Sequence, residues 1–579
     1  MLIPQLERFL TAKLNENKRQ NRIYLLFWLI LSLCFAAVYI GLGIRQGFSS
    51  EYVIGDDARE YISWMYRYLN PELFPNDLIA DYFQSVTPIG YGGIYRLMMS
   101  LGVDAIVLIK ILPIVLGLTT TGYGFAVCMQ ILPVPIAGFL ATLILNQSLG
   151  LHDDLFSGCP RDFTYPLFLA FLYYLMRGSA PGVIVAFIIQ ALIYPIIAFI
   201  ELGILFLRLW DWQNMRFRFS QQRQNYILFG FALAAGLITV TPYALQSSQF
   251  GPTISDAMAR TMPDYFRGGR VSYYNDNIVS FWLDGRDSGL FALLNPVQLL
   301  IGLLLPVILV YQQRFSTKLK ITNQVKVLLQ VFLASTVMFF IAHALSFKLH
   351  FPSRYTHHTF KMVLAIGAGV VLSVLLESTF NWVRQTQSNK SIKRILIYLV
   401  TPIIGAALVL YPTTLKTFPK TLYVVGSAPA LYEFLQKQPT NSLVASLAEE
   451  ADNIPPFAKQ SILVGKEYAL PFHTKYYAQF SQRMTDLINA QYSQDINQVV
   501  NFIDKYRVKY WLLERNAFEP EYISKSTWIQ QYQPAAKIAT GKLLQGSDFV
   551  LPGLIKSCGV VESGDLFLLK AECIKAGNG

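Results

Sequence analysis

The chain has 579 residues, of which 53% are hydrophobic and only 15% are charged. Soluble proteins carry about 45–50% apolar and about 25% charged residues, so this composition excludes a water-soluble protein and indicates one that lipid largely solvates. The net charge of +12 comes mainly from basic residues in short loops beside apolar runs. The positive-inside rule explains that placement, and we expect no nucleic-acid partner.

The apolar runs predict a mostly α-helical, polytopic membrane domain over residues 1–411. A helix needs about 20 apolar residues to cross the hydrocarbon core. The first run is longer than the core of a signal peptide, and no small-residue cleavage pattern follows it, so we expect a retained anchor. Runs of spanning length lie at 23–44, 103–129, 131–147, 226–246, 291–311, 327–347, 359–377 and 395–411.

The segment 163–210 decides how many times the chain crosses the membrane. If it forms two spans, 163–177 and 181–207, twelve basic residues in three loops fall outside the cell. If it forms three short spans with a break at Tyr194-Pro195, all twelve fall inside, as the positive-inside rule requires. We therefore predict about eleven spans, with a cytoplasmic N-terminus, in the plasma (inner) membrane.

This topology places five segments outside the cytoplasm, namely 45–102, 148–162, 247–290, 348–358 and 412–579. We predict that the last of these is a soluble extracytoplasmic α/β domain, because short apolar runs alternate with amphipathic helices. No glycine-rich phosphate loop follows its strands, so we assign it no cofactor. The expected strands are 422–426, 442–447, 461–465 and 509–514, and the expected helices are 429–438, 474–491 and 494–506.

Two cysteines in this domain, Cys558 and Cys573, bracket a strand-like stretch at 559–569. Disulfides form and persist outside the cytoplasm. If the topology above holds, these two cysteines can therefore form a disulfide.

The first outer loop contains the motif Gly55-Asp56-Asp57-Ala58-Arg59-Glu60. The residues after it, 61–69, have helical spacing with Trp64, Met65 and Tyr68 on one apolar side, so we expect an amphipathic helix along the outer membrane interface. Aspartates at the start of that helix can cap it. Helix capping beside solvated charge is therefore the alternative to a catalytic role for the motif.

The layout of about residues 1–210 resembles the GT-C superfamily of glycosyltransferases, since one span and a long outer loop that opens with an aspartate pair follow a cytoplasmic N-terminus. Members of that superfamily take sugars from polyprenyl-phosphate carriers at the outer face of a membrane. The resemblance implies that Asp56 and Asp57 supply the catalytic carboxylate and that Arg59 and Glu60 contribute to substrate binding. A carboxylate can take the proton that an acceptor hydroxyl loses as it attacks the anomeric carbon. The implied partners are a polyprenyl-phosphate-linked sugar donor, an acceptor whose identity stays open, and the lipid bilayer.

Cationic side chains in other outer loops are candidates for binding the lipid phosphate. Arg161 lies just before a predicted span, and Arg354 lies in a short loop where Tyr355, His357 and His358 follow it. Arginine stabilises the negative charge that grows on a leaving phosphate, and protonated histidine also bonds phosphate. The alternative for these residues is an aromatic and basic belt that anchors helix ends at the interface.

The second outer loop contains His152-Asp153-Asp154 and Asp162. Some members of the superfamily complete a metal site with acids from a second loop, which makes Asp153 and Asp154 candidate ligands for Mg²⁺ or Mn²⁺ together with the aspartate pair. Other members work without a metal, and a solvated cap at a helix end is the alternative. The loop 247–290, rich in Tyr, Asp and Arg, can shape an acceptor groove.

Two other functions remain alternatives to a glycosyltransferase. Ion-driven transporters and flippases for lipids or polysaccharides usually carry ionisable residues inside their spans. Lys110 and His343 lie near predicted outer helix ends, which leaves Glu201 as the residue that favours a transporter. The other alternative is a non-catalytic membrane scaffold that binds a partner through its outer domain.

Overall fold

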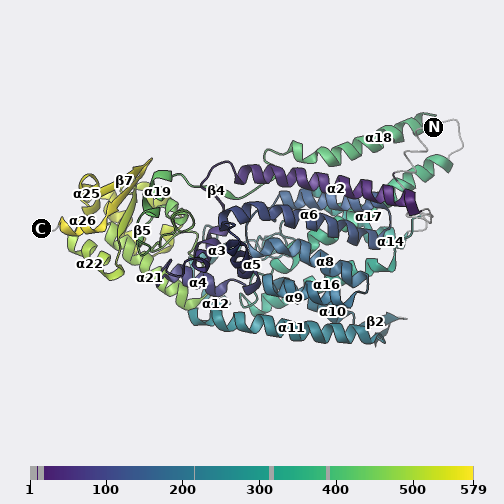
Figure 1. The fold of residues 1–579 in the computed structure, drawn as a ribbon, viewed down its shortest axis with the longest axis horizontal. Coiled ribbons are helices and arrows are strands. Elements are labelled where there is room, and N and C mark those ends of the chain that lie inside the picture. Colours follow the sequence, from purple (N-terminus) through teal and green to yellow (C-terminus); the bar gives the residue numbers. More distant parts are fainter. Residues whose placement is uncertain (1–9, 11–17, 214–215, 312–318, 386–390, 578–579) are drawn as a thin grey trace.

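The structure is a computed structural model that describes residues 10, 18–213, 216–311, 319–385 and 391–577. It is mostly helical, with a long helical bundle at one end and a smaller mixed domain at the other (Figure 1). The C-terminus lies in the small domain, and the first helix of the bundle begins at the far end of the molecule (Figure 1). The short helices of the first outer loop lie between these two parts (Figure 1).

Five of the bundle helices contain segments long and apolar enough to cross a membrane. They are α2 (Lys18–Gly47), α6 (Ala105–Ile131), α11 (Arg223–Ser247), α16 (Lys326–Leu345) and α17 (Arg354–Gln385). Shorter helices lie at the other predicted spans: α7 (Pro135–Gly150), α8 (Thr164–Met176), α9 (Ala180–Ile193), α10 (Pro195–Leu207), η5 (Val297–Leu304) with α14 (Leu305–Val310), and α18 (Ser391–Leu410). These helices agree with a multi-pass membrane protein, and the number of crossings stays a prediction.

Helix α17 is the most deeply buried of the five long helices, and it packs on α7 and η5. A Cβ on Gly369 would lie 2.5 Å from the carbonyl oxygen of Ala137 in α7, so only glycine permits this approach. Small residues matter here because van der Waals packing, rather than the hydrophobic effect, holds helices together in lipid. The contact fixes α17, whose first turns carry Arg354 and the neighbouring candidate site residues.

The segment 163–210 forms three helices, and the chain breaks at Tyr194 as the sequence predicts. The Gly178 carbonyl before α9 accepts a hydrogen bond from Gln224 (3.2 Å), and the Arg208 carbonyl after α10 accepts one from Asn225 (3.0 Å). The start of α9 and the end of α10 therefore meet the same end of α11, so the chain reverses between them. At the opposite end of α9, beside the break at Tyr194, the first outer loop comes close to the helix. A Cβ on Gly90 would lie 2.8 Å from Leu192, so glycine permits this contact.

The C-terminal domain is built around a four-stranded sheet of order β5-β6-β8-β7. Its core includes Trp511, which is fully buried. The strands are β5 (Val444–Ser446), β6 (Tyr510–Glu514), β7 (Gly559–Ser563) and β8 (Leu566–Lys570), of which only β5 and β6 pair in parallel. The helices include α19 (Pro429–Gln436), α20 (Ile454–Ala458), α21 (Thr474–Gln491), α22 (Ile496–Tyr506), α23 (Glu521–Lys525), α24 (Ala535–Leu544), α25 (Val550–Cys558) and α26 (Ala571–Ala576).

Two strand predictions need correction, and a third predicted strand is present but pairs outside the domain's sheet. The stretch 461–465 is not a strand, because it makes only an isolated bridge between Ile462 and Val444. The stretch 559–569 is a hairpin of two strands. The strand expected at 422–426 exists as β4 (Tyr423–Val425), but it pairs with β1 (Val53–Gly55) of the first outer loop instead of joining the domain's sheet.

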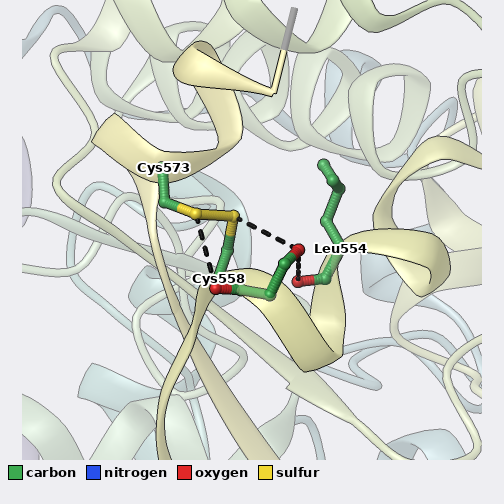
Figure 2. Close-up of a disulfide and its surroundings, with 4 residues drawn as sticks. Leu554, Cys558 and Cys573 are labelled. Carbon is green, nitrogen blue, oxygen red and sulfur yellow. Dashed lines mark hydrogen bonds between the residues drawn. A yellow bond between two sulfur atoms is a disulfide. The ribbon is translucent and has the colours of Figure 1, made fainter.

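The disulfide between Cys558 and Cys573 is present, as the sequence suggested (Figure 2). It links the end of α25 to α26, so it closes the base of the β7–β8 hairpin. Such a bond is typical of an oxidising compartment, as the predicted extracytoplasmic placement requires.

The apolar side of the helix after the acidic motif is covered by protein. This helix is α3 (Ala58–Met65), which packs against α4 (Leu78–Val86), α6 and α20 of the C-terminal domain. Trp64 is 3% exposed and Met65 is fully buried. The apolar side that suggested a lipid contact therefore faces protein instead.

The reversal at Tyr194 gives a topology test. In a Cys34→Ser background, we expect a membrane-impermeant maleimide added to intact cells to label Tyr194→Cys but not Arg177→Cys. The reason is that these positions lie at opposite ends of α9. Permeabilised cells, in which both positions should react, provide the control. Labelling of Arg177→Cys from outside intact cells would contradict the predicted orientation.

Candidate active site

The acidic motif is held at the junction of three segments. The pairing of β1 with β4 ends where the Asp56 amide donates to the carbonyl of Leu422 (2.9 Å). A Cβ on Gly55 would lie 2.8 Å from the carbonyl oxygen of Ser157, so glycine lets the first outer loop approach the second. The two aspartates thus leave the strand beside the second outer loop.

The Asp57 side chain does not cap α3, although Asp57 occupies the cap position. Its carboxylate instead forms an ion pair with Arg161 at 2.5 Å, and both side chains keep partial exposure, 26% for Asp57 and 19% for Arg161. The capping alternative is therefore wrong for Asp57. Arg161 lies in η2 (Pro160–Phe163), from the second outer loop.

Asp162 fixes the loop that presents Arg161. It accepts hydrogen bonds from the Gly158 amide (2.9 Å) and the Cys159 amide (3.3 Å), and from the Ser157 hydroxyl at 2.5 Å. Burial raises the pKa of Asp162 to about 7, although these donors and Arg161 oppose the shift. Asp162 therefore acts on the site by holding the turn, and it does not face the solvent.

Three arginines from three different outer segments act on Asp57. Burial alone would raise the pKa of Asp57, but Arg161, followed by Arg270 and Arg354, outweighs it and lowers the pKa to about 2. Asp57 is therefore ionised at every physiological pH in this arrangement. Arg354 also pairs with Asp287 (3.4 Å), and Asp287 lies in the segment that the sequence assigned to an acceptor groove. The Asp57 carboxylate is thus paired with Arg161 and lies within the electrostatic influence of two further arginines.

The C-terminal domain contributes a second set of charges through Glu467. Its carboxylate pairs with Arg270 (2.6 Å) and with Arg59 (3.3 Å). Arg270 also reaches Glu60 (3.2 Å), and Arg59 pairs with Asp56. Arg59 and Glu60, expected to bind substrate, are thus engaged in joining the motif to the C-terminal domain.

The segment that carries Glu467 ties several outer loops together. Arg59 donates to Asn453 (3.2 Å), and Tyr265 donates to the carbonyl of Pro471 at 2.5 Å. The Ile254 amide donates to the carbonyl of Phe472 (2.9 Å). The sequence analysis did not single out Glu467 or Arg270. Glu467 is 408 positions from Arg59, to which it is hydrogen-bonded, and no local sequence pattern marks an acid with so distant a partner.

Asp154 does not join the aspartate pair. It lies with His357 and His358, and the ammonium of Lys361 lies 2.6 Å from its carboxylate and 2.7 Å from Nε2 of His357. His358 Nδ1 faces the hydroxyl of Tyr165 (2.9 Å). This cluster is almost completely buried, below the surface that carries Arg161 and Arg354.

Two of the remaining candidates, Asp153 and Tyr355, are buried away from the Asp57–Arg161 ion pair. Asp153 is 2% exposed and lies outside both groups of potential metal ligands. Burial, followed by the neighbouring charge of Asp162, raises its pKa well above the usual value. Tyr355 is fully buried and donates to the carbonyl of Leu349 (2.9 Å).

Two groups of side chains bring three ligand atoms within reach of one ion, and they differ in how well they fit a divalent metal. Asp154, His357 and His358 form one group, but the ammonium of Lys361 already neutralises it. Asp56, Asp57 and Glu467 form the other. Each of these carboxylates pairs with an arginine, but Asp56 and Glu467 share Arg59, and Glu467 also shares Arg270 with Glu60. Four carboxylates thus face three arginines, which leaves one surplus negative charge to offset a dication, so the residues present fit a metal poorly.

No family model matches the chain, and no curated protein matches it. Among solved structures, the chain is similar to an oligosaccharyltransferase from Archaeoglobus fulgidus tethered with an acceptor peptide, with 12% identity, a TM-score of 0.47, and coverage of 89% of this chain and 72% of that one. It is also similar to archaeal AglB from the same organism in complex with an inhibitory peptide and a dolichol-phosphate, with 10% identity, a TM-score of 0.45 and the same coverage of 89% and 72%. A complex of the oligosaccharyltransferase with Zn and sulfate matches at 12% identity with a TM-score of 0.37, over 88% of this chain and 70% of that one. Because the TM-scores are low, the proposals below rest on the side chains of this chain.

The buried acid Glu467 predicts a pH-dependent stability. Burial raises its pKa from the ordinary value of 4.5 to about 7, so between these pH values the folded protein holds a proton that the unfolded chain releases. The free energy of unfolding should therefore fall as the pH rises through this window. Glu467→Gln has no proton to lose and should flatten the dependence, by at most about 3 kcal/mol.

Melting temperatures of the purified protein in detergent measure this effect. Glu521→Gln, which removes an exposed acid paired with Lys525, is the matched control and should keep the wild-type slope. Equal slopes for the wild type and Glu467→Gln would contradict the assignment.

Proposed function

We propose that this protein transfers a sugar from a polyprenyl-phosphate-linked donor to an acceptor at the outer face of the membrane. The observation that carries the proposal is the carboxylate of Asp57 among three arginines, Arg161, Arg270 and Arg354, beside the ends of membrane helices. Polyprenyl carriers are lipids, so a multi-pass helical bundle suits them. Their phosphate requires cations, and the attacking acceptor hydroxyl requires a base.

The proposed reaction is a direct displacement. The oxygen of an acceptor hydroxyl forms a bond to the anomeric carbon while the bond from that carbon to the phosphate oxygen breaks. The hydroxyl proton goes to Asp57, and the electron pair of the broken bond stays on the phosphate. Arg161 and Arg354 stabilise the growing negative charge through charge-assisted hydrogen bonds.

The resting ion pair gives this mechanism an order of events. With Arg161 bound to it, Asp57 has a pKa of about 2 and is a weak base. A donor phosphate competes with Asp57 for the same guanidinium. When Arg161 turns to the phosphate, its stabilising effect on the carboxylate falls and the pKa of Asp57 rises, which makes Asp57 a stronger base only when donor is bound.

Asp56 has a different role in this proposal. Its carboxylate pairs with Arg59, which also contacts Glu467 of the C-terminal domain. Asp56 is therefore a positioning residue that holds the start of α3. The arginines supply the positive charge that a metal ion supplies in other enzymes, and the proposed reaction needs no Mg²⁺ or Mn²⁺.

Substitution of the base tests the proposal. We expect Asp57→Asn to lower the rate of sugar transfer about 10²- to 10⁴-fold, the usual contribution of a positioned general base. The measurement is transfer from a radiolabelled polyprenyl-phosphate sugar to extracted cell-envelope acceptors by the purified protein in nanodiscs. An unchanged melting temperature would show that the variant folds.

Glu201→Gln is the matched control. Glu201 lies in α10, fully buried, and neither of its carboxylate oxygens has a hydrogen-bond partner in the described part of the chain. This is the residue that favours a transporter, and its substitution should leave transfer unchanged. If the wild type shows no sugar transfer, and Glu201→Gln but not Asp57→Asn abolishes the biological activity, the transporter alternative is correct.

A further inference from the structure

A groove of about 640 Å³ lies where the first outer loop meets the C-terminal domain. Residues 75–77 form one wall, and Arg483 in the middle of α21, the end of α22, two residues of α26 and the segments beside β5 form the other. Its volume is within the usual range of ligand sites, about 300–1,000 Å³. Its lining is mostly polar, and the proposed mechanism uses none of it.

The acids of the groove are already engaged. Asp77 accepts from the amides of Ile79 and Ala80 at the start of α4. Asp504 pairs with Lys575 at 2.5 Å. Glu572 pairs with Lys570 at 3.1 Å. Asp504 and Glu572 are thus in ion pairs, whereas Asp77 makes backbone hydrogen bonds and is influenced by the charge of Arg483 without pairing with it.

The cations Arg483, Arg507 and Lys509 are not matched in this way. Within the described residues, no carboxylate lies at ion-pairing distance from any of the three. Arg483 is half-buried, and its one side-chain hydrogen bond goes to the carbonyl of Leu463 (3.4 Å). Burial lowers the pKa of Arg483, and the nearby charge of Asp77 opposes this shift without reaching ion-pairing distance. A guanidinium in that condition is normally paired with an anion.

The neighbouring sheet edge shows which kind of ligand the groove does not take. Strand β5 is an edge of the domain's sheet, where an extended peptide could add a strand. That edge is already occupied, because the Val444 amide donates to the carbonyl of Ser461 and the Leu463 amide donates to the carbonyl of Val444, both at 2.9 Å. A ligand must therefore be recognised by side chains.

We propose that this groove binds an anionic oligosaccharide, whose carboxylate or phosphate groups pair with Arg483, Arg507 and Lys509. The amides of Asn76 and Asn441 match sugar hydroxyls, which both donate and accept hydrogen bonds, and the Tyr506 ring offers an apolar surface for a sugar face.

This inference rests on the proposed function, since the oligosaccharide would be its acceptor. A structural link supports that assignment. Asp77 and Ile462 line both the groove and a small void of about 10 Å³ that Glu60 also lines. Glu60 belongs to the acidic motif and pairs with Arg270, so the groove wall continues into the network around Asp57.

The inference is tested by calorimetry, which measures the binding of oligosaccharides to the full chain in nanodiscs of neutral lipid. Galacturonate oligosaccharides are the anionic probe, and malto-oligosaccharides of equal length are the neutral probe. We expect binding of the galacturonate probe alone. The double variant Arg507→Gln, Lys509→Gln should weaken it at least about tenfold, a loss of about 1.4 kcal/mol. Arg515→Gln, which removes an exposed arginine paired with Glu562 and Asp565 outside the groove, is the matched control and should bind like the wild type.

Equal affinity of the wild type and the double variant, or equal binding of both probes, would overturn the inference. So would competition by vesicles of phosphatidylglycerol without any binding of the galacturonate probe, because the groove would then be a site for lipid headgroups. Asp57→Asn separates the two proposals, since it should retain binding of the probe whether or not it loses transfer.

Discussion

The ion pair between Asp57 and Arg161 joins the first two outer loops, and the arrangement of the outer face depends on it. Each partner is placed by backbone contacts that leave its side chain free to face the other. The β1–β4 pairing ends at Asp56, and the hydrogen bonds of Asp162 fix the turn before Arg161. An aspartate in such a cationic setting cannot be a helix cap or a solvated surface charge. It keeps three cations together at one point until another anion competes for them.

The C-terminal domain contributes directly to the structure around the acidic motif. Its linker supplies β4, and Glu467 supplies the carboxylate that holds Arg59 and Arg270. Because these charges are almost shielded from water, each needs its partner in place. The position of the domain and the geometry of the acidic motif therefore depend on the same few ion pairs.

Hydropathy and loop charge were enough to predict much of the bundle. The break at Tyr194 was predicted from the positive-inside rule, although neither α9 nor α10 alone has the length of an ordinary span. The resemblance of the layout also brought together residues that the structure places side by side, since Asp57, Arg161 and Arg354 come from three separate loops.

The errors have a common physical cause, which is that local sequence shows what a segment prefers but not which partner satisfies it. Strand propensity at 422–426 was correct, yet its partner is β1 in the membrane domain. The helix after the motif is amphipathic, yet its apolar side faces protein. Asp154 was grouped with the aspartate pair because it is an acid in an outer loop, whereas Lys361, buried in α17, takes its charge. Glu467 gave no signal at all, because its role exists only after the domain has docked.

The most direct test of the central claim is a cryo-electron microscopy structure of the protein in nanodiscs with bound polyprenyl phosphate. The account predicts phosphate density in contact with Arg161 and Arg354, and an Asp57–Arg161 separation longer than the 2.5 Å of the unliganded pair. Phosphate density elsewhere on the protein, with the Asp57–Arg161 pair unchanged, would contradict it.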